Sequence, residues 1–142
     1  MAFKPGHGAH ILMDSVAGTP VNVTAYADNF SFPVPTDSLD VSVFGTSSKQ
    51  FIPGLTGGGQ PSLSGPLDVA LGTFVAAIIN AQAAGSTASY TVTYSPGGSV
   101  AGQIKQSAEV FITNYTPSTA VGGRAEYSCT LQGTGATTFT TW

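Results

Sequence analysis

The side chains with metal-binding chemistry gather near the N-terminus, where His7, His10 and Asp14 follow one another closely. Imidazole and carboxylate groups can bind zinc, but a zinc site needs three or four ligands held in a fixed geometry. His7 lies in a Gly- and Pro-rich stretch, which predicts a flexible arm over residues 1–8. Such an arm holds ligands poorly, so neither a metal nor any other cofactor is expected.

The remaining reactive groups do not form a catalytic pattern. A Ser-His-Asp triad needs a histidine base that its neighbours orient, and both histidines lie on or beside the N-terminal arm. The glycine run at 57–59 lacks the Gly-Lys-Ser/Thr of a phosphate-binding loop. Cys129 falls on the apolar side of an alternating segment, which predicts a packed thiol rather than a nucleophile. The sequence therefore predicts a protein that is not an enzyme.

The composition indicates one domain whose surface is unusually poor in charge. The chain has 142 residues, of which 42% are hydrophobic and 8% charged. Globular domains typically carry about 25% charged residues. Between Val69 and Ile104 there is no acidic or basic residue at all. Because exposed surfaces normally carry mixed charges, we expect other subunits to cover much of this one.

The charges that are present argue against tight binding of nucleic acid. The net charge is −3, and the four basic residues are scattered rather than clustered. With one cysteine, no internal disulfide can form. No apolar run approaches the ~18 residues of a membrane span. We therefore expect a protein made in the cytosol without membrane insertion.

Most of the chain alternates between apolar and polar residues, which is typical of strands half-buried in a sheet. The pattern predicts a mainly β fold, an antiparallel sandwich or barrel with one flanking α-helix. The expected strands cover residues 9–14, 21–24, 39–44, 87–94, 104–115, 124–132 and 137–142.

One helix is predicted from Ala70 to Ala84, and Gly85 ends it. Its apolar residues follow helical spacing and should pack on the sheet: Leu71, Phe74, Val75, Ile78 and Ile79. The opposite side carries small uncharged residues. We expect part of it, namely Ala76, Ala77 and Asn80, to contact a neighbouring subunit, although it could equally be a partly exposed surface.

A second candidate contact lies in a Gly- and Ser-rich segment over residues 46–64, expected as a long loop. Exposed apolar side chains on a loop usually dock on another surface. The candidate contact residues are Lys49, Phe51, Ile52, Pro53 and Leu55. The glycines at 57–59 should let this loop reorient between the free and the assembled subunit.

The same region resembles a known family. The stretch VFGTSSKQFIPGL, followed by SLSG and an Asp, is similar to the major tail tube protein of long-tailed, siphovirus-like bacteriophages. The similarity is densest over residues 39–68 and continues more loosely in the order of elements to residue 142. It implies that six copies form a ring, that rings stack into a tube, and that the joined sheets form a continuous barrel for DNA delivery.

The resemblance also implies partners and a location. The partners are further copies of the chain and other tail proteins, namely the tape measure, tail tip and terminator, and the location is the virion tail after assembly in the host cytoplasm. Double-stranded DNA would pass through without specific binding, which a neutral to acidic wall favours. The candidate lumen-facing residues lie on the polar sides of two predicted strands: Lys105, Glu109, Arg124, Glu126, Ser128 and Thr130.

Two alternatives remain open at this point. Another virion β-protein, such as a capsid decoration or tail-terminator subunit, would form closed trimers or single rings instead of open-ended tubes. A monomeric immunoglobulin-like binding module would instead offer a groove with exposed aromatic side chains.

Overall fold

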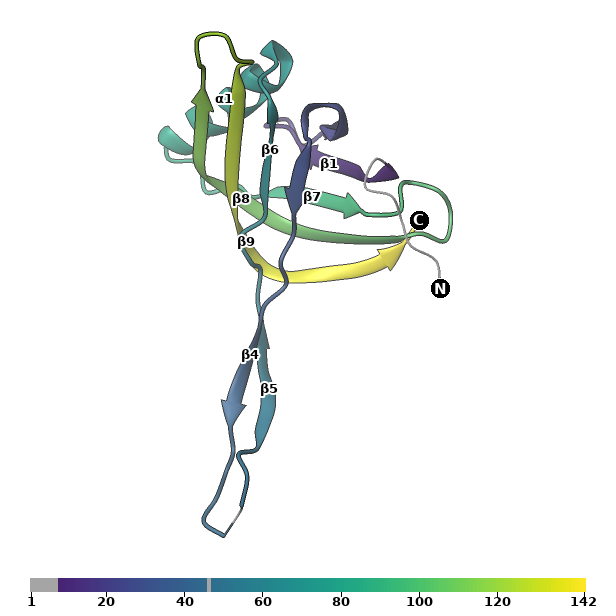
Figure 1. The fold of residues 1–142 in the computed structure, drawn as a ribbon, viewed down its shortest axis with the longest axis vertical. Helices are drawn as coiled ribbons and strands as arrows, with labels where there is room; N and C mark the ends of the chain where they lie inside the picture. The colour runs from purple at the N-terminus through teal and green to yellow at the C-terminus, as the bar shows by residue number, and fades with distance from the viewer. Residues whose placement is uncertain (1–7, 46) are drawn as a thin grey trace.

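The strands form two antiparallel sheets, and one α-helix covers a face of the larger sheet (Figure 1). The computed structural model describes residues 8–45 and 47–142. The larger sheet has the strand order β2-β1-β7-β8-β9-β6-β3, and β4 and β5 pair separately. The strands are β1 (His10–Asp14), β2 (Pro20–Asn22), β3 (Asn29–Ser31), β4 (Thr36–Asp40), β5 (Phe51–Thr56), β6 (Ser62–Pro66), β7 (Tyr90–Ser95), β8 (Ile104–Ser118) and β9 (Glu126–Thr141). The predicted mainly β, antiparallel class with one flanking helix is confirmed.

The large sheet is curled, and the chain connection between its two edge strands requires this shape. Six gaps of ~4.8 Å would separate seven flat strands by roughly 29 Å. Only residues 23–28 join β2 to β3, and an extended chain of that length reaches roughly 24 Å. The sheet is therefore bent toward a half-open barrel.

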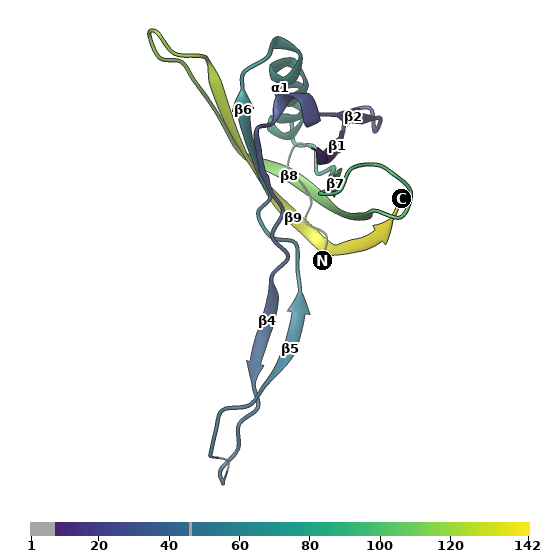
Figure 2. The same ribbon diagram turned by 45° about the vertical axis from the view of Figure 1, so that its right-hand side comes forward.

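Helix α1 (Val69–Ala83) lies on the inner side of the curl and fills it (Figure 2). Asp68 caps its first turn by accepting a hydrogen bond from the backbone N–H of Ala70 at 2.8 Å. Gly85 follows the helix with a φ of 94°, a conformation that favours glycine. The helix predicted over 70–84 is thus confirmed to within one residue at each end.

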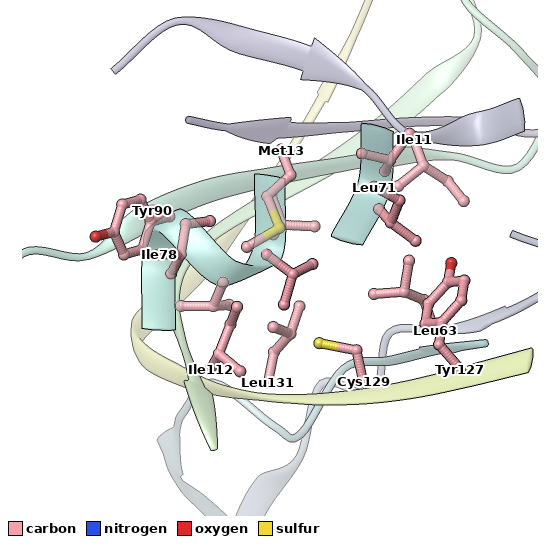
Figure 3. Packing of buried hydrophobic residues seen from close by; sticks show 14 residues of the cluster. Ile11, Met13, Leu63, Leu71, Ile78, Tyr90, Ile112, Tyr127, Cys129 and Leu131 are labelled. Atoms are coloured by element: carbon pink, nitrogen blue, oxygen red, sulfur yellow. The ribbon is translucent and has the colours of Figure 1, made fainter. Parts of the chain in front are cut away.

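The core forms where α1 meets the inner face of the sheet (Figure 3). Leu71, Val75 and Ile78 are the buried residues of the helix, whereas Phe74 and Ile79 are only partly buried. From the sheet come the side chains of Ile11, Met13, Leu63, Tyr90, Val92, Val110, Ile112, Tyr127, Cys129 and Leu131. Of the residues predicted to point inward over 124–132, Tyr127, Cys129 and Leu131 are buried, whereas Ala125 lies before β9 and is only partly buried.

Strands β8 and β9 are longer than the sequence pattern predicts. The segments expected as two strands, over 124–132 and 137–142, belong to one 16-residue strand. A register shift interrupts its pairing with β8 between Ser107 and Glu109, opposite Thr134 to Thr138. This irregularity, together with Gly133 and Gly135, hides the continuity from the alternation pattern. Ile104, at the start of β8, is exposed.

The segment over 46–64, predicted as one long loop, contains two strands, which corrects the prediction. Residues 51–56 form β5, which pairs with β4 in a hairpin that projects far from the body of the molecule (Figures 1 and 2). The last part of the segment forms the start of β6, which lies between β9 and β3 in the large sheet. The predicted strand over 39–44 ends at Asp40.

The glycines at the root of the hairpin permit close backbone contact. A Cβ atom added at Gly58 would lie 2.6 Å from the Cα of Gly133 in β9. One added at Gly59 would lie 2.5 Å from the carbonyl oxygen of Pro33. Gly133 also donates a backbone hydrogen bond to the carbonyl of Gly59 at 2.8 Å. Gly58 and Gly59 are therefore required for close packing at the hairpin root, and the expected reorientation on assembly stays a prediction.

Candidate assembly surfaces

The projecting hairpin carries half of the large apolar side chains that are exposed in the described part of the chain. They are Leu39, Val41, Val43, Phe44, Phe51, Ile52 and Leu55. Leu39 pairs with Ile52 across the two strands, so the side chains of these two residues lie on the same face of the hairpin. Phe51 and Pro53 occupy alternate positions of β5 and lie on the other face, and the exposed Leu55 follows within the register shift between Pro53 and Thr56. Both faces of the hairpin are thus apolar and open to solvent.

Polar contacts near the tip hold the two hairpin strands together. The backbone N–H of Gln50 donates to the Ser42 hydroxyl at 2.7 Å, and the N–H of Val41 donates to the Gln50 carbonyl at 2.9 Å. Hydrogen bonds from the backbone and side chain of Ser42 lower the pKa of the Asp40 carboxyl. The predicted contact residues Phe51, Ile52, Pro53 and Leu55 lie together on β5, while Lys49 precedes it.

The outer face of the large sheet, opposite α1, is lined mainly by hydroxyl and amide side chains. Cross-strand pairs connect Ser62 with Thr130 and Ser64 with Ser128, and Ser31 bonds to Ser62 at 2.9 Å. The pairing of β7 with β8 continues the same face with further polar residues, namely Thr91, Thr93, Ser107 and Glu109. We call this surface the hydroxyl face. Four predicted lumen residues on β8 and β9, Glu109, Glu126, Ser128 and Thr130, share it.

Neighbouring side chains bind the few charges of the hydroxyl face. The carboxylate of Glu109 accepts hydrogen bonds from Ser89 at 2.9 Å and Thr91 at 2.6 Å. At one end of the face, the Nζ of Lys105 lies 4.4 Å from the centroid of the Trp142 ring, which attracts a cation. The Trp142 Nε1–H donates to the buried Ser95 hydroxyl at 2.7 Å. Trp142, which an immunoglobulin-like binding module would need exposed, is held against the sheet.

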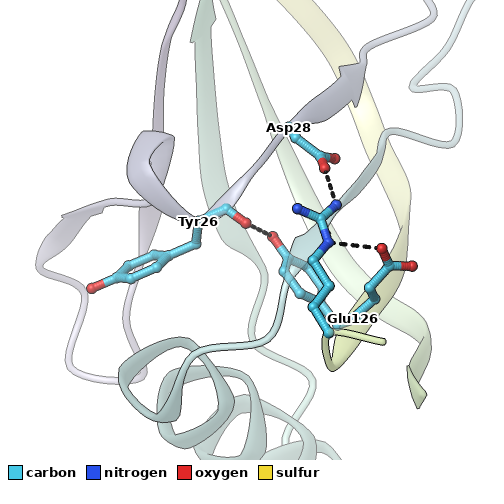
Figure 4. A network of polar contacts seen from close by, with 5 residues as sticks. Tyr26, Asp28 and Glu126 are labelled. Atoms are coloured by element: carbon cyan, nitrogen blue, oxygen red, sulfur yellow. Dashed lines mark hydrogen bonds and ion pairs between the residues drawn. The ribbon is translucent and has the colours of Figure 1, made fainter. Parts of the chain in front are cut away.

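Arg124 is the one predicted lumen residue outside the strands. It lies in the connection between β8 and β9, and two acidic side chains form ion pairs with it (Figure 4). Its Nη2 lies 2.7 Å from the Asp28 carboxylate, and its Nε lies 2.8 Å from Glu126. Two carboxylates around one guanidinium leave a net negative group. This arrangement offers little attraction to a phosphate backbone.

Helix α1 has an exposed side without charged residues. The predicted contact residues Ala76, Ala77 and Asn80 are all exposed there. The helix has no acidic residue in its first turn and no basic residue in its last. Exposed surfaces of this kind suit contact with another subunit.

The reactive groups near the core are buried rather than presented to a substrate. Burial raises the pKa of the Cys129 thiol to about 12. Burial is also the main cause that raises the pKa of Tyr127, whose hydroxyl donates to the Tyr26 carbonyl at 2.7 Å. Both groups stay protonated at neutral pH, which fits the predicted packed thiol.

Neither a metal site nor a membrane-spanning helix is found within residues 8–45 and 47–142. No three His, Cys, Asp or Glu side chains in these ranges lie close enough together to bind a metal ion. His7 lies outside the described residues, while His10 contacts the Trp142 ring edge-on with centroids 5.7 Å apart. The α-helix is too short to cross a membrane.

Comparison with known proteins gives matches by structure alone. No protein-family model matches the sequence, and no curated protein is similar to it at a significant level. The tail of an empty gene transfer agent particle, determined with C6 symmetry, is 17% identical, with a TM-score of 0.69 over 97% of this chain and 99% of that chain. The SPP1 tail tube protein is 15% identical, with a TM-score of 0.69 over 99% of this chain and 80% of that one.

A further match is a tube-terminating cap. The tube-terminating cap of the anti-feeding prophage is 15% identical, with a TM-score of 0.72 over 100% of this chain and 93% of that chain. The chain therefore has the tail tube fold, and the resemblance read from residues 39–68 is confirmed at the level of the fold. These structural neighbours are tail, tail tube and tube cap components, not enzymes.

Proposed function

We propose that this protein is a tail tube subunit that assembles into stacked hexameric rings, whose channel carries double-stranded DNA to the host. The observation that carries the proposal is the projecting hairpin, which is apolar on both faces and contributes no residue to the buried core. A monomer gains nothing from such an element, since exposed apolar strands promote aggregation. A second subunit that covers the hairpin explains why it is retained.

The hydroxyl face supports the role of a channel wall. Basic side chains would bind a duplex that carries one phosphate charge per ~1.7 Å. On this face the carboxylates are exposed, Lys105 lies over Trp142 and the Arg124 guanidinium is bound by Asp28 and Glu126. A wall of hydroxyl groups with a slight negative charge lets DNA slide.

The strand edges support closure into a ring. β7 begins at Tyr90, opposite Val110, so β8 has a neighbouring strand on one side only over 111–118 within the described chain. On the other side of β9, the segment that leads into β6 (residues 59–62) contacts β9 only as far as Gly133. Within the described chain, β9 therefore has β8 as its one neighbouring strand over 134–141. These edges lie at opposite ends and on opposite sides of the β8–β9 pair. A rotated copy can place one edge antiparallel to the other, which is a head-to-tail contact that closes a ring.

The remaining parts of the proposal follow from the tube. Its partners are further copies of this chain and the tape measure, tail tip and terminator proteins. Its location is the virion tail after assembly in the host cytoplasm, and virion tail components among the structural neighbours support this location.

A tube terminator is the second candidate. The TM-score of 0.72 with a tube-terminating cap favours it as much as the tail tube scores favour a tube subunit. A terminator stops growth and forms single rings, whereas a tube subunit forms open-ended stacks. The length of the assembly that the purified protein forms therefore separates the two.

Shortening the hairpin tests whether it connects subunits. Replacing residues 39–52 with an Asn-Gly turn keeps Ser38 beside Pro53 and removes six of the exposed apolar side chains. Thermal unfolding should stay cooperative, because the core keeps all of its residues. Sedimentation and electron microscopy should find wild-type tubes but only free subunits or single rings of the variant. Long tubes of the shortened protein would contradict the proposal.

A further inference from the structure

The side chain of Gln82 in α1 hydrogen-bonds to the main chain of β8, just past the pair formed by Val110 and the first residue of β7. The Nε2 of Gln82 donates to the Ile112 carbonyl at 2.9 Å, and its Oε1 accepts from the Ile112 N–H at 3.0 Å. A carboxamide offers the same donor and acceptor pair as a peptide group. Gln82 therefore acts as one extra residue of β7, two positions beyond the last pair, Tyr90 with Val110.

The side chain also divides the surface along this edge into two hollows. One, of about 350 Å³, is lined by Gln82, the 86–89 segment, Phe111 and Thr134. The other, of about 480 Å³, is also lined by Gln82, together with Ile79, Ala83 and residues 112–115 of β8. A strand that extends along β8 from the second hollow would meet the Gln82 carboxamide at Ile112.

We propose that Gln82 sets the register of the subunit contact by closing β8 at Ile112. The unpaired edge of β9, residues 134–141 of a second copy, then pairs with β8 only over residues 114–118. This inference rests on the proposed ring. Both edges belong to the same chain and run antiparallel when one copy is rotated onto the next, so the occupant is a second copy.

A side chain that ends the pairing at Ile112 is useful because polar strands pair with a weakly specified register. A polar sheet without a buried apolar set on its outer face can slip by two residues at little cost. Here the outer residues of both strands are mainly Ser and Thr, which do not distinguish one register from another. An occupied N–H and C=O at Ile112 removes one partner position and so excludes the longer pairings.

Hydrogen exchange of the free subunit tests the stop itself. In the wild type the Ile112 amide should exchange slowly, although it lies beyond the pairing with β7. Gln82→Ala should speed the exchange of this amide by about tenfold, because losing the two hydrogen bonds raises the equilibrium constant for local opening by roughly that factor. Asn80→Ala, which removes an exposed carboxamide from the same helix, is the matched control and should leave this amide unchanged. An equally slow Ile112 amide in Gln82→Ala would overturn the proposal.

The same measurement on assembled wild-type protein tests the register without any variant. Amides on the unpaired edge within 114–118 should become protected on assembly, while Ile112 keeps the rate of the free subunit. Assemblies that form without new protection at 114–118 would overturn this inference and leave the tube function intact. Failure to assemble at all would instead contradict the proposed function. In Gln82→Ala assemblies, Ile112 should regain protection from the neighbouring strand, and no regained protection would argue against the stop.

Discussion

At the scale of single residues, the buried thiol of Cys129 links stability to pH. Its pKa is raised to about 12 in the folded protein from an ordinary value of 9.0. A raised pKa means that folding favours the protonated thiol. The stabilisation is complete below pH 9 and is lost as pH rises from 9 toward 12.

We therefore expect urea unfolding at pH 10 to show a free energy about 1 kcal/mol lower on account of Cys129 than at pH 7.5. Tyr127, whose pKa is also raised by burial, adds to the loss at higher pH. Cys129→Ala should lose less stability between the two pH values than the wild type. An identical decrease in both proteins would show that the thiol does not titrate in the unfolding reaction.

Residue-level prediction works where burial follows alternation and fails where a partner residue is distant. The inward positions of Tyr127, Cys129 and Leu131 follow from period-two spacing. The ion pair of Arg124 with Asp28 joins residues 96 positions apart, and no local pattern contains it. The contact of Lys105 with Trp142 is likewise visible only once β8 lies beside β9.

At the scale of elements, fewer side chains of the helix are buried against the sheet than the five apolar residues with helical spacing predict. Ile78 is 0% exposed, whereas Phe74 is only partly buried. Ile78→Ala should cost about 2–5 kcal/mol, and Phe74→Ala should cost less than the ~3–5 kcal/mol of a fully buried ring. Chemical denaturation measures both values. A larger cost for Phe74→Ala would contradict the packing seen at the inner face.

The hairpin shows why some elements are hidden from the sequence. The helix has a 3.6-residue period, an Asp cap and a terminal glycine, so its ends can be predicted. β5 contains Pro53 and Gly54 and has exposed side chains on both faces, so neither alternation nor composition marks it as a strand. Its partner β4 ends at Asp40, with ten residues between it and the start of β5 at Phe51, and neither strand contributes a residue to the buried core that would mark it in the sequence.

At the scale of the whole molecule, the proposal that the hydroxyl face lines a channel predicts a defined effect of added positive charge. Ser128→Lys with Thr130→Lys should leave tubes intact but make them retain short duplex DNA, because lysines bind phosphates. The measurement is co-sedimentation of labelled duplex with tubes at moderate salt. Thr119→Lys with Ala120→Lys, in the exposed turn between β8 and β9, is the control with equal charge. Equal DNA retention by both variants would argue that the hydroxyl face does not line the channel.

The central claim is that this chain assembles into a hollow tube with its hydroxyl face inward. Cryo-electron microscopy of the purified, concentrated protein tests it most directly. We expect open-ended stacks of six-subunit rings, with Ser128 and Thr130 facing the lumen and the hairpin of each subunit covered by a neighbour. Single closed rings would favour a terminator, and particles that remain monomeric, or tubes with the hydroxyl face outside, would contradict the account.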